Sequence, residues 1–71
     1  NILFLAETVV RENTVLKDAA QYKKFYGVDP LKGYNFKFAC YQGAYKYTIW
    51  DYFPNANEHN TILIMDEILS I

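Results

Sequence analysis

The sequence predicts an α+β domain in which one amphipathic helix packs on a small antiparallel sheet. Three features indicate this fold: a helical stripe with a stop signal over residues 15–26, alternating apolar and polar residues over residues 34–53, and a short apolar run over residues 61–65. A chain of 71 residues is long enough for one domain, so we expect residues 1–71 to form a single unit. The alternative is that the chain is a fragment or a subunit of a larger assembly.

The N-terminal segment, residues 1–12, is compatible with two structures. Its apolar residues Ile2, Leu5, Ala6 and Val9 have the spacing of one helical face. The uninterrupted apolar run at residues 2–5 equally suits a buried strand. We therefore leave this segment as either a strand or a helix.

A helix is predicted at about residues 15–26. Val15, Ala19, Tyr22 and Tyr26 recur at the spacing of one helical face, which gives the helix an apolar side that can pack on a sheet.

The ends of this helix are predicted from capping chemistry. Asn13 or Thr14 can cap the first turn, because the side-chain oxygen accepts a hydrogen bond from an unpaired backbone N–H. Gly27 suits the left-handed position that follows a helix, and Pro30 prevents the helix from continuing.

A β-hairpin is predicted over residues 34–53. The even-numbered positions of residues 34–41 and several odd-numbered positions of residues 44–53 are apolar, as expected for two strands with one buried face each. A two-residue turn at Gln42 and Gly43 would bring these positions together on one face. In that register the facing pairs are Cys40 with Tyr45, Phe38 with Tyr47, and Phe36 with Ile49.

This register also predicts which side chains are buried. We expect Phe36, Phe38 and Tyr47 to lie beneath the helix, and Trp50 to point away from it on the outer face of the hairpin.

The last predicted element is a strand at residues 61–65. Residues 54–60 are rich in Asn and contain a Pro, which is typical of a loop. The strand that follows is apolar on both faces, which predicts a central or covered position in the sheet. A helix that begins near Asn60 is the alternative, because Ile62, Met65 and Leu69 also have helical spacing.

The residues that could support catalysis do not form a recognisable motif. Cys40 is expected on the buried face of a strand, and His59 lies in a polar loop without a second His or Cys nearby. The three glycines are dispersed and there is a single serine, so neither a phosphate-binding loop nor a serine nucleophile motif is present. We therefore predict a non-catalytic protein without a cofactor, a catalytic residue or a metal site. A small enzyme, or a cleaved enzyme fragment, that uses Asp51, Glu58 and His59 is the alternative.

The aromatic residues favour a protein-binding function. Seven Tyr, five Phe and one Trp are many for this length, and Trp and Tyr dominate the energetics of protein interfaces. We predict a protein-interaction domain, such as an inhibitor, an immunity-type protein or an accessory subunit, that binds a partner or a second copy of itself through an aromatic sheet face or a sheet edge. Trp50, Tyr41 and Tyr52 are the candidate contact residues, and Lys46 is a candidate rim residue.

The charge balance and the hydropathy of the chain bear on two other classes of partner, nucleic acids and membranes. Single-stranded RNA or DNA stacked on the same aromatic residues is an alternative, but 7 Lys+Arg against 8 Asp+Glu disfavour phosphate binding. The apolar runs are too short to span a bilayer. A single cysteine and the lack of a visible signal peptide favour an intracellular location.

Overall fold

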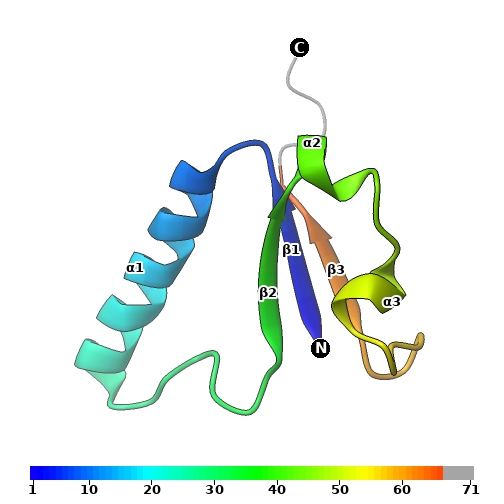
Figure 1. The fold of residues 1–71 in the computed structure, drawn as a ribbon. Helices are drawn as coiled ribbons and strands as arrows, with labels where there is room; N and C mark the ends of the chain where they lie inside the picture. The colour runs from blue at the N-terminus through cyan, green and yellow to red at the C-terminus, as the bar shows by residue number, and fades with distance from the viewer. Residues whose placement is uncertain (67–71) are drawn as a thin grey trace.

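The computed structural model describes residues 1–66 as a small sheet with helices on both sides (Figure 1). In chain order the elements are β1 (Ile2–Ala6), α1 (Val9–Tyr26), β2 (Phe36–Cys40), α2 (Tyr41–Ala44), α3 (Ile49–Tyr52) and β3 (Ile62–Met65). The chain is α+β in content, as predicted, but the arrangement of its strands is different.

All the strands of the sheet are parallel, in the order β2-β1-β3. β1 lies at the centre and pairs Phe4 with Phe38 on one side and with Ile64 on the other. Residues 3–6 of β1 are buried, which a strand between two others requires. The apolar run at the N-terminus is therefore a strand, and the helix starts only after it.

The connections place the helices on opposite faces of the sheet. α1 links β1 to β2 on one face, whereas α2 and α3 lie in the connection from β2 to β3 and cover the other face (Figure 1). Parallel neighbours need such crossover connections, because the chain must return to the same end of the sheet before each new strand. The first crossover leads from β1 to β2, and the second leads back past β1 to β3. Right-handed crossovers that run in opposite directions place their helices on opposite faces of the sheet.

The predicted antiparallel sheet and its hairpin over residues 34–53 are wrong. Residues 36–40 are a strand, but Gln42 and Gly43 lie inside α2, and Ile49 belongs to α3. The alternation identified the faces of the first strand without identifying its partner, which is β1. None of the predicted pairs, Cys40 with Tyr45, Phe38 with Tyr47 or Phe36 with Ile49, is formed.

A local cap explains why residues 49–52 are helical. The Asp51 carboxylate accepts hydrogen bonds from the Thr48 backbone N–H at 2.7 Å and from the Thr48 hydroxyl at 3.2 Å. A carboxylate that accepts from the N-cap backbone three residues earlier is typical of the first turn of a helix, and α3 starts immediately after Thr48.

Helix α1 ends as predicted but begins earlier. Gly27 adopts a left-handed φ of 73°, and its N–H donates to the Lys23 carbonyl at 2.8 Å. The helix begins at Val9 rather than near residue 15, with Thr8 at the N-cap position. The predicted cap, Asn13 or Thr14, was wrong because no residue between Val9 and Thr14 interrupts the helix.

The strand predicted at residues 61–65 is present as β3, at Ile62–Met65. It is not central or covered, because it pairs with β1 alone and forms an edge of the sheet. The alternative helix beginning near Asn60 is not formed over the residues of β3, and Leu69 lies outside the described residues.

The core lies between β1 and the α2–α3 side. Leu3 and Leu5 pack with Phe53 and Ala56, and partly buried residues of both short helices surround them. Tyr47 borders Leu3 and Leu5 on this side, so its predicted place beneath α1 is wrong.

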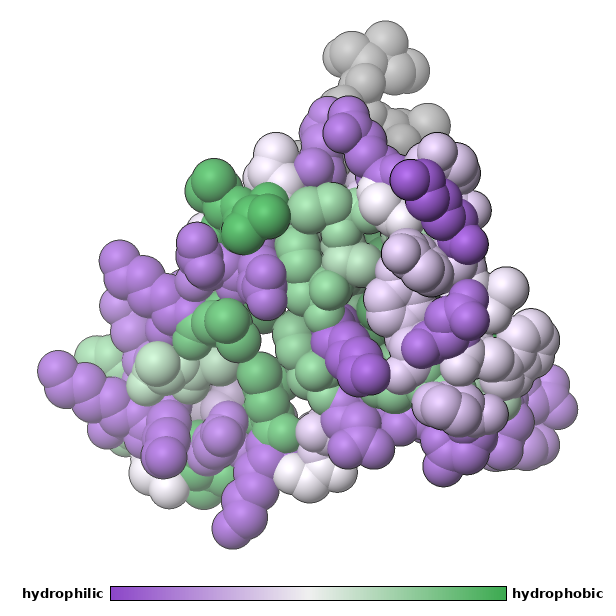
Figure 2. Space-filling view, viewed as in Figure 1, coloured by the Kyte–Doolittle hydropathy of each residue, from purple (hydrophilic) through white to green (hydrophobic). Residues whose placement is uncertain are grey.

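The α1 side of the sheet is less completely covered. Phe4 lies 6.3 Å from Phe36 and 5.9 Å from Phe38, measured between ring centroids, and these rings point toward α1 as predicted for the two β2 residues. No residue of α1, whose full length is described, is buried. Apolar side chains remain visible between α1 and β2 (Figure 2).

The different burial of β1 and β3 predicts different mutational costs. Leu3→Ala should lower the free energy of unfolding by about 2–5 kcal/mol, because it leaves a cavity in the core. Ile62→Ala removes a side chain of a residue that is 56% exposed and should cost about 1 kcal/mol or less. Urea denaturation of both variants measures the difference. An equal or larger loss for Ile62→Ala would contradict the exposed edge described above.

Candidate interaction surface

The open edge of β3 combines exposed apolar side chains with an edge position in the sheet. Ile62, Leu63, Ile64 and Met65 are 56%, 51%, 39% and 43% exposed, and none is charged. Apolar side chains on both faces are typical of strands in the interior of a parallel sheet. β3 therefore has the composition of an interior strand but occupies an edge.

Among residues 1–66, no strand pairs with the backbone of β3 along the same edge. The Ile62 N–H donates to the carbonyl of Asn1, just before β1, at 2.9 Å. The N–H of Asp66, just after β3, donates to the carbonyl of Leu5 in β1, also at 2.9 Å. Successive residues of a strand direct their backbone groups to opposite sides, so the N–H and C=O groups of Leu63 point away from β1. This edge can pair with a further strand.

The other edge of the sheet is different. β2 carries Lys37, whose ammonium donates to the Tyr52 carbonyl at 2.7 Å and lies 5.3 Å from the centre of the Phe53 ring. A charged residue on an edge strand discourages pairing with another chain. β2 thus has a protecting residue, whereas the four residues of β3 have none.

A groove lies beside Leu63 on the α3 side of β3. Its volume is about 300 Å³, and most of its surface is apolar, with Asn57 and Glu58 among the polar residues. The Trp50 indole N–H donates to the Ala56 carbonyl at 3.0 Å, which holds one wall in place. The residues that line the groove are Ile49, Trp50, Ala56, Asn57, Glu58, Thr61 and Leu63.

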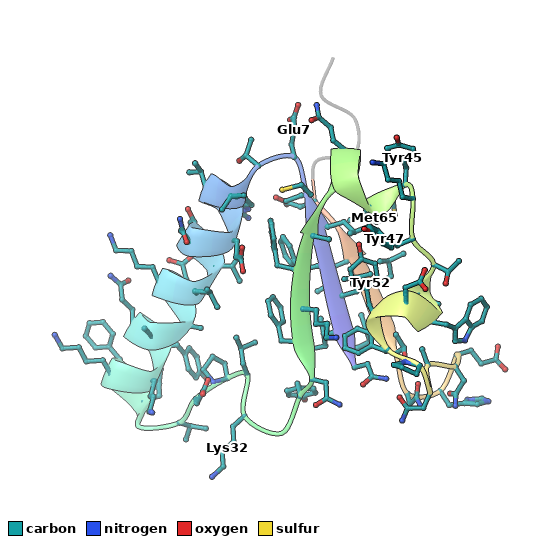
Figure 3. The ribbon with its side chains drawn as sticks, in the orientation of Figure 1. Glu7, Lys32, Tyr45, Tyr47, Tyr52 and Met65 are labelled. Atoms are coloured by element: carbon teal, nitrogen blue, oxygen red, sulfur yellow. The ribbon has the colours of Figure 1, made fainter. Side chains whose placement is uncertain are left out.

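Aromatic residues continue this surface along β3. Tyr47 and Tyr52 make an edge-to-face contact with ring centroids 5.9 Å apart, and both border Leu63. Figure 3 shows Tyr47 and Tyr52 on the segment that follows β2, next to the sheet. We call Ile62–Met65 together with Tyr47, Trp50 and Tyr52 the β3 surface.

The structure places the predicted contact residues on helices rather than on a sheet face. Trp50 and Tyr52 belong to α3, Tyr41 begins α2, and Lys46 lies between these helices with its ammonium 5.8 Å from the centre of the Tyr45 ring. Trp50 and Tyr52 therefore border β3. The sequence reasoning missed β3 itself as a candidate contact element, although the uncharged composition of residues 62–65 was a visible signal.

Tyr41 connects α2 with the end of β3. Its hydroxyl donates to the Asp66 carbonyl at 2.8 Å. Desolvation of the phenol raises the pKa of Tyr41 above its ordinary value of 10.0, and the nearby Asp66 carboxylate raises it further. Tyr41 is therefore held in its neutral, hydrogen-bonding form.

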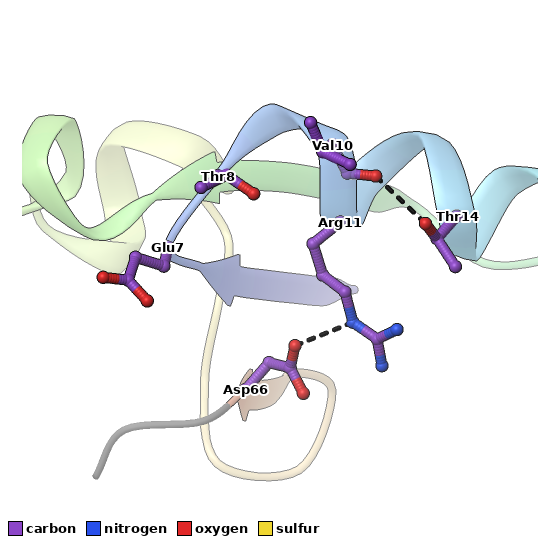
Figure 4. A pocket seen from close by; sticks show the side chains of 6 residues that line it. All are labelled: Glu7, Thr8, Val10, Arg11, Thr14 and Asp66. Atoms are coloured by element: carbon purple, nitrogen blue, oxygen red, sulfur yellow. Dashed lines mark hydrogen bonds and ion pairs between the residues drawn. The ribbon is translucent and has the colours of Figure 1, made fainter. Parts of the chain in front are cut away.

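A small pocket opens where β1 and β3 end. Arg11 and Asp66 form an ion pair across it, with Nε and Oδ2 2.8 Å apart (Figure 4). The crevice at the carboxyl ends of parallel strands is where ligands commonly bind in such sheets. Here the guanidinium is engaged by a carboxylate, and the pair joins α1 to the end of β3. The lining residues are Glu7, Thr8, Val10, Arg11, Thr14 and Asp66.

The three residues of the alternative enzyme site, Asp51, Glu58 and His59, do not come together in the structure. Asp51 caps α3, whereas Glu58 and His59 pair with each other at 3.3 Å on side chains that are 86% and 84% exposed. No hydrogen bond or ion pair joins Asp51 to the other two within residues 1–66. Cys40 is half-buried at the end of β2.

Comparison with protein-family models, with curated proteins and with solved structures finds no significant match to this chain. Over the described part of the chain, no group of three or more His, Cys, Asp or Glu residues is arranged to hold a metal ion. No helix within residues 1–66 combines the length and hydropathy needed to cross a bilayer.

The Tyr41 hydrogen bond predicts a pH dependence of stability. Because the pKa of Tyr41 is raised in the folded chain, the unfolded chain loses this proton first as the pH rises. The contribution of Tyr41 should therefore be complete below about pH 10 and be lost as the pH rises through the folded-state pKa. Tyr41→Phe should show a smaller loss of stability between about pH 8 and 11 than the unchanged chain, measured by urea denaturation.

Tyr45→Phe is the matched control, because Tyr45 is 77% exposed. It should keep the full pH dependence of the unchanged chain. Identical pH profiles for Tyr41→Phe and the unchanged chain would contradict the role of the Tyr41 hydroxyl.

Proposed function

We propose that this chain is a non-catalytic protein-interaction domain that binds its partner by adding a strand to the open edge of β3. One observation carries the proposal: four consecutive uncharged residues, Ile62–Met65, are exposed on an edge strand. Exposed apolar patches on soluble proteins commonly mark interaction sites.

Strand addition fits both the backbone and the side chains of β3. The backbone groups of Leu63 that point away from β1 can form main-chain hydrogen bonds with an extended partner segment. The side chains on the α1 face, Ile62 and Ile64, and those on the α3 face, Leu63 and Met65, would then be covered by apolar side chains of the partner. The partner thus completes the sheet on both faces.

The predicted contact residues belong to this proposal. Trp50 and Tyr52 flank β3 and supply large aromatic area, which is typical of residues that contribute most to binding. Tyr41, which is hydrogen-bonded to the end of β3, and the exposed Lys46 would lie nearer the rim. Stacking of nucleic-acid bases on a flat aromatic sheet face loses its basis, because Tyr41 and Trp50 lie in helices.

A charged residue in β3 provides the test. Ile64→Lys should remove most strand-dependent binding, because the ammonium would have to be buried against the added strand. Phe25→Lys is the matched control, since Phe25 is 80% exposed in the last turn of α1, at the end of the helix far from β3 (Figure 1). Immobilised versions of the chain would be compared for the proteins that each captures from an extract of its natural source, quantified by mass spectrometry.

The expected result is a set of proteins retained by the unchanged chain and by Phe25→Lys but reduced at least about tenfold with Ile64→Lys. Circular dichroism spectra should be the same for all three chains. Equal capture by folded Ile64→Lys and the unchanged chain would rule out β3 as the binding edge.

A further inference from the structure

The groove beside Leu63 suggests which kind of strand β3 accepts. The groove is open, largely apolar and about 300 Å³ in volume, which is enough for one large side chain. Trp50 forms one wall and is held by its hydrogen bond to the Ala56 carbonyl at 3.0 Å. The wall is therefore in place before a partner arrives, which lowers the entropic cost of binding.

The geometry of a sheet determines which residue of an added strand meets this groove. Side chains that are neighbours across two paired strands lie on the same face, and alternate residues of one strand point to opposite faces. A residue paired with Leu63 would lie over the groove. The residues before and after it would lie beside Ile62 and Ile64 on the α1 face.

A negative charge at the rim of the groove places a second requirement on the added strand. Glu58 lines the groove with a side chain that is 86% exposed, and its carboxylate lies 3.3 Å from the imidazole Nε2 of the neighbouring His59. No Lys or Arg is among the residues lining this groove in the described part of the chain. A basic side chain on the same face as the residue in the groove would complement Glu58.

The same charge argues against a second copy of the chain as the occupant. The β3 strand of another copy is uncharged and is followed directly by Asp66. Pairing of two β3 strands would therefore supply no basic residue to Glu58 and would bring additional carboxylates to the interface.

The geometry points to an extended segment of another protein as the occupant. One bulky apolar side chain of this segment enters the groove formed with Trp50 and Leu63, and a Lys or Arg two residues away meets Glu58. This inference rests on the proposed function, since it specifies the strand that β3 receives.

A short peptide serves as the probe. An acetylated and amidated Lys-Val-Phe-Val-Lys peptide places the Phe on one face with a Lys two residues away in either strand direction, and both Val on the other face. Trp50 is the single Trp of the chain, so its fluorescence reports occupation of the groove. We expect a saturable change in Trp50 fluorescence, and Ile64→Lys should abolish it.

Variants of the peptide test each requirement. Alanine in place of the Phe should weaken binding about tenfold or more, because the groove then stays unfilled. Glutamate in place of both Lys should also weaken binding to the unchanged chain. With Glu58→Gln the difference between the Lys and Glu peptides should shrink several-fold, whereas Asp18→Asn, which removes a carboxylate from α1, should leave it unchanged.

Failure of this inference can be distinguished from failure of the proposed function. Equal affinity of the Phe and Ala peptides, or no fluorescence change at millimolar peptide, would overturn the inference. Self-association of the peptide-free chain that Ile64→Lys abolishes, seen by sedimentation velocity at micromolar concentration, would make a second copy the occupant and overturn it as well. In each of these cases, a loss of captured proteins with Ile64→Lys would still support β3 as the binding edge.

Discussion

The structure depends on the double pairing of β1. Residues 2–6 pair in parallel with β2 on one side and residues 2–5 pair with β3 on the other, and residues 3–6 are buried between them. Parallel pairing requires a crossover after β1 and another after β2. The position of β1 therefore dictates where α1, α2 and α3 lie (Figure 1). It also dictates which strands become the edges of the sheet.

The two edges that result are not equivalent. β2 carries Lys37, which is bound to the backbone of α3, whereas β3 is apolar on both faces and open along its backbone. Burial of apolar surface is the main favourable term in folding and in most protein association. Within the described residues β3 contributes little to that burial. A partner strand would supply the contacts that an interior strand normally has on its second side, and this is the physical basis of the binding that we propose.

The aromatic residues show how a sequence prediction and the tertiary structure arrive at the same side chains by different routes. Their excess in the composition favours an interface in any fold, because large aromatic side chains contribute strongly to binding. The choice of Trp50 and Tyr52, in contrast, rested on a hairpin face that the structure does not contain. The cap formed by Thr48 and Asp51 turns residues 49–52 into a helix, and this helix carries Trp50 to the side of Leu63. No periodicity in the sequence relates those two residues.

Local patterns in the sequence by themselves determined the elements that depend on neighbouring residues. The end of α1 at Gly27 and the strand at residues 62–65 follow from backbone preference and from hydropathy over a few positions. Only the tertiary structure decided the direction and the neighbours of the strands. An alternating pattern states which face of a strand is buried, whereas the choice between a nearby antiparallel partner and the distant β1 depends on the total burial that each arrangement achieves. That choice left β3 at the edge and created the surface to which we assign the function.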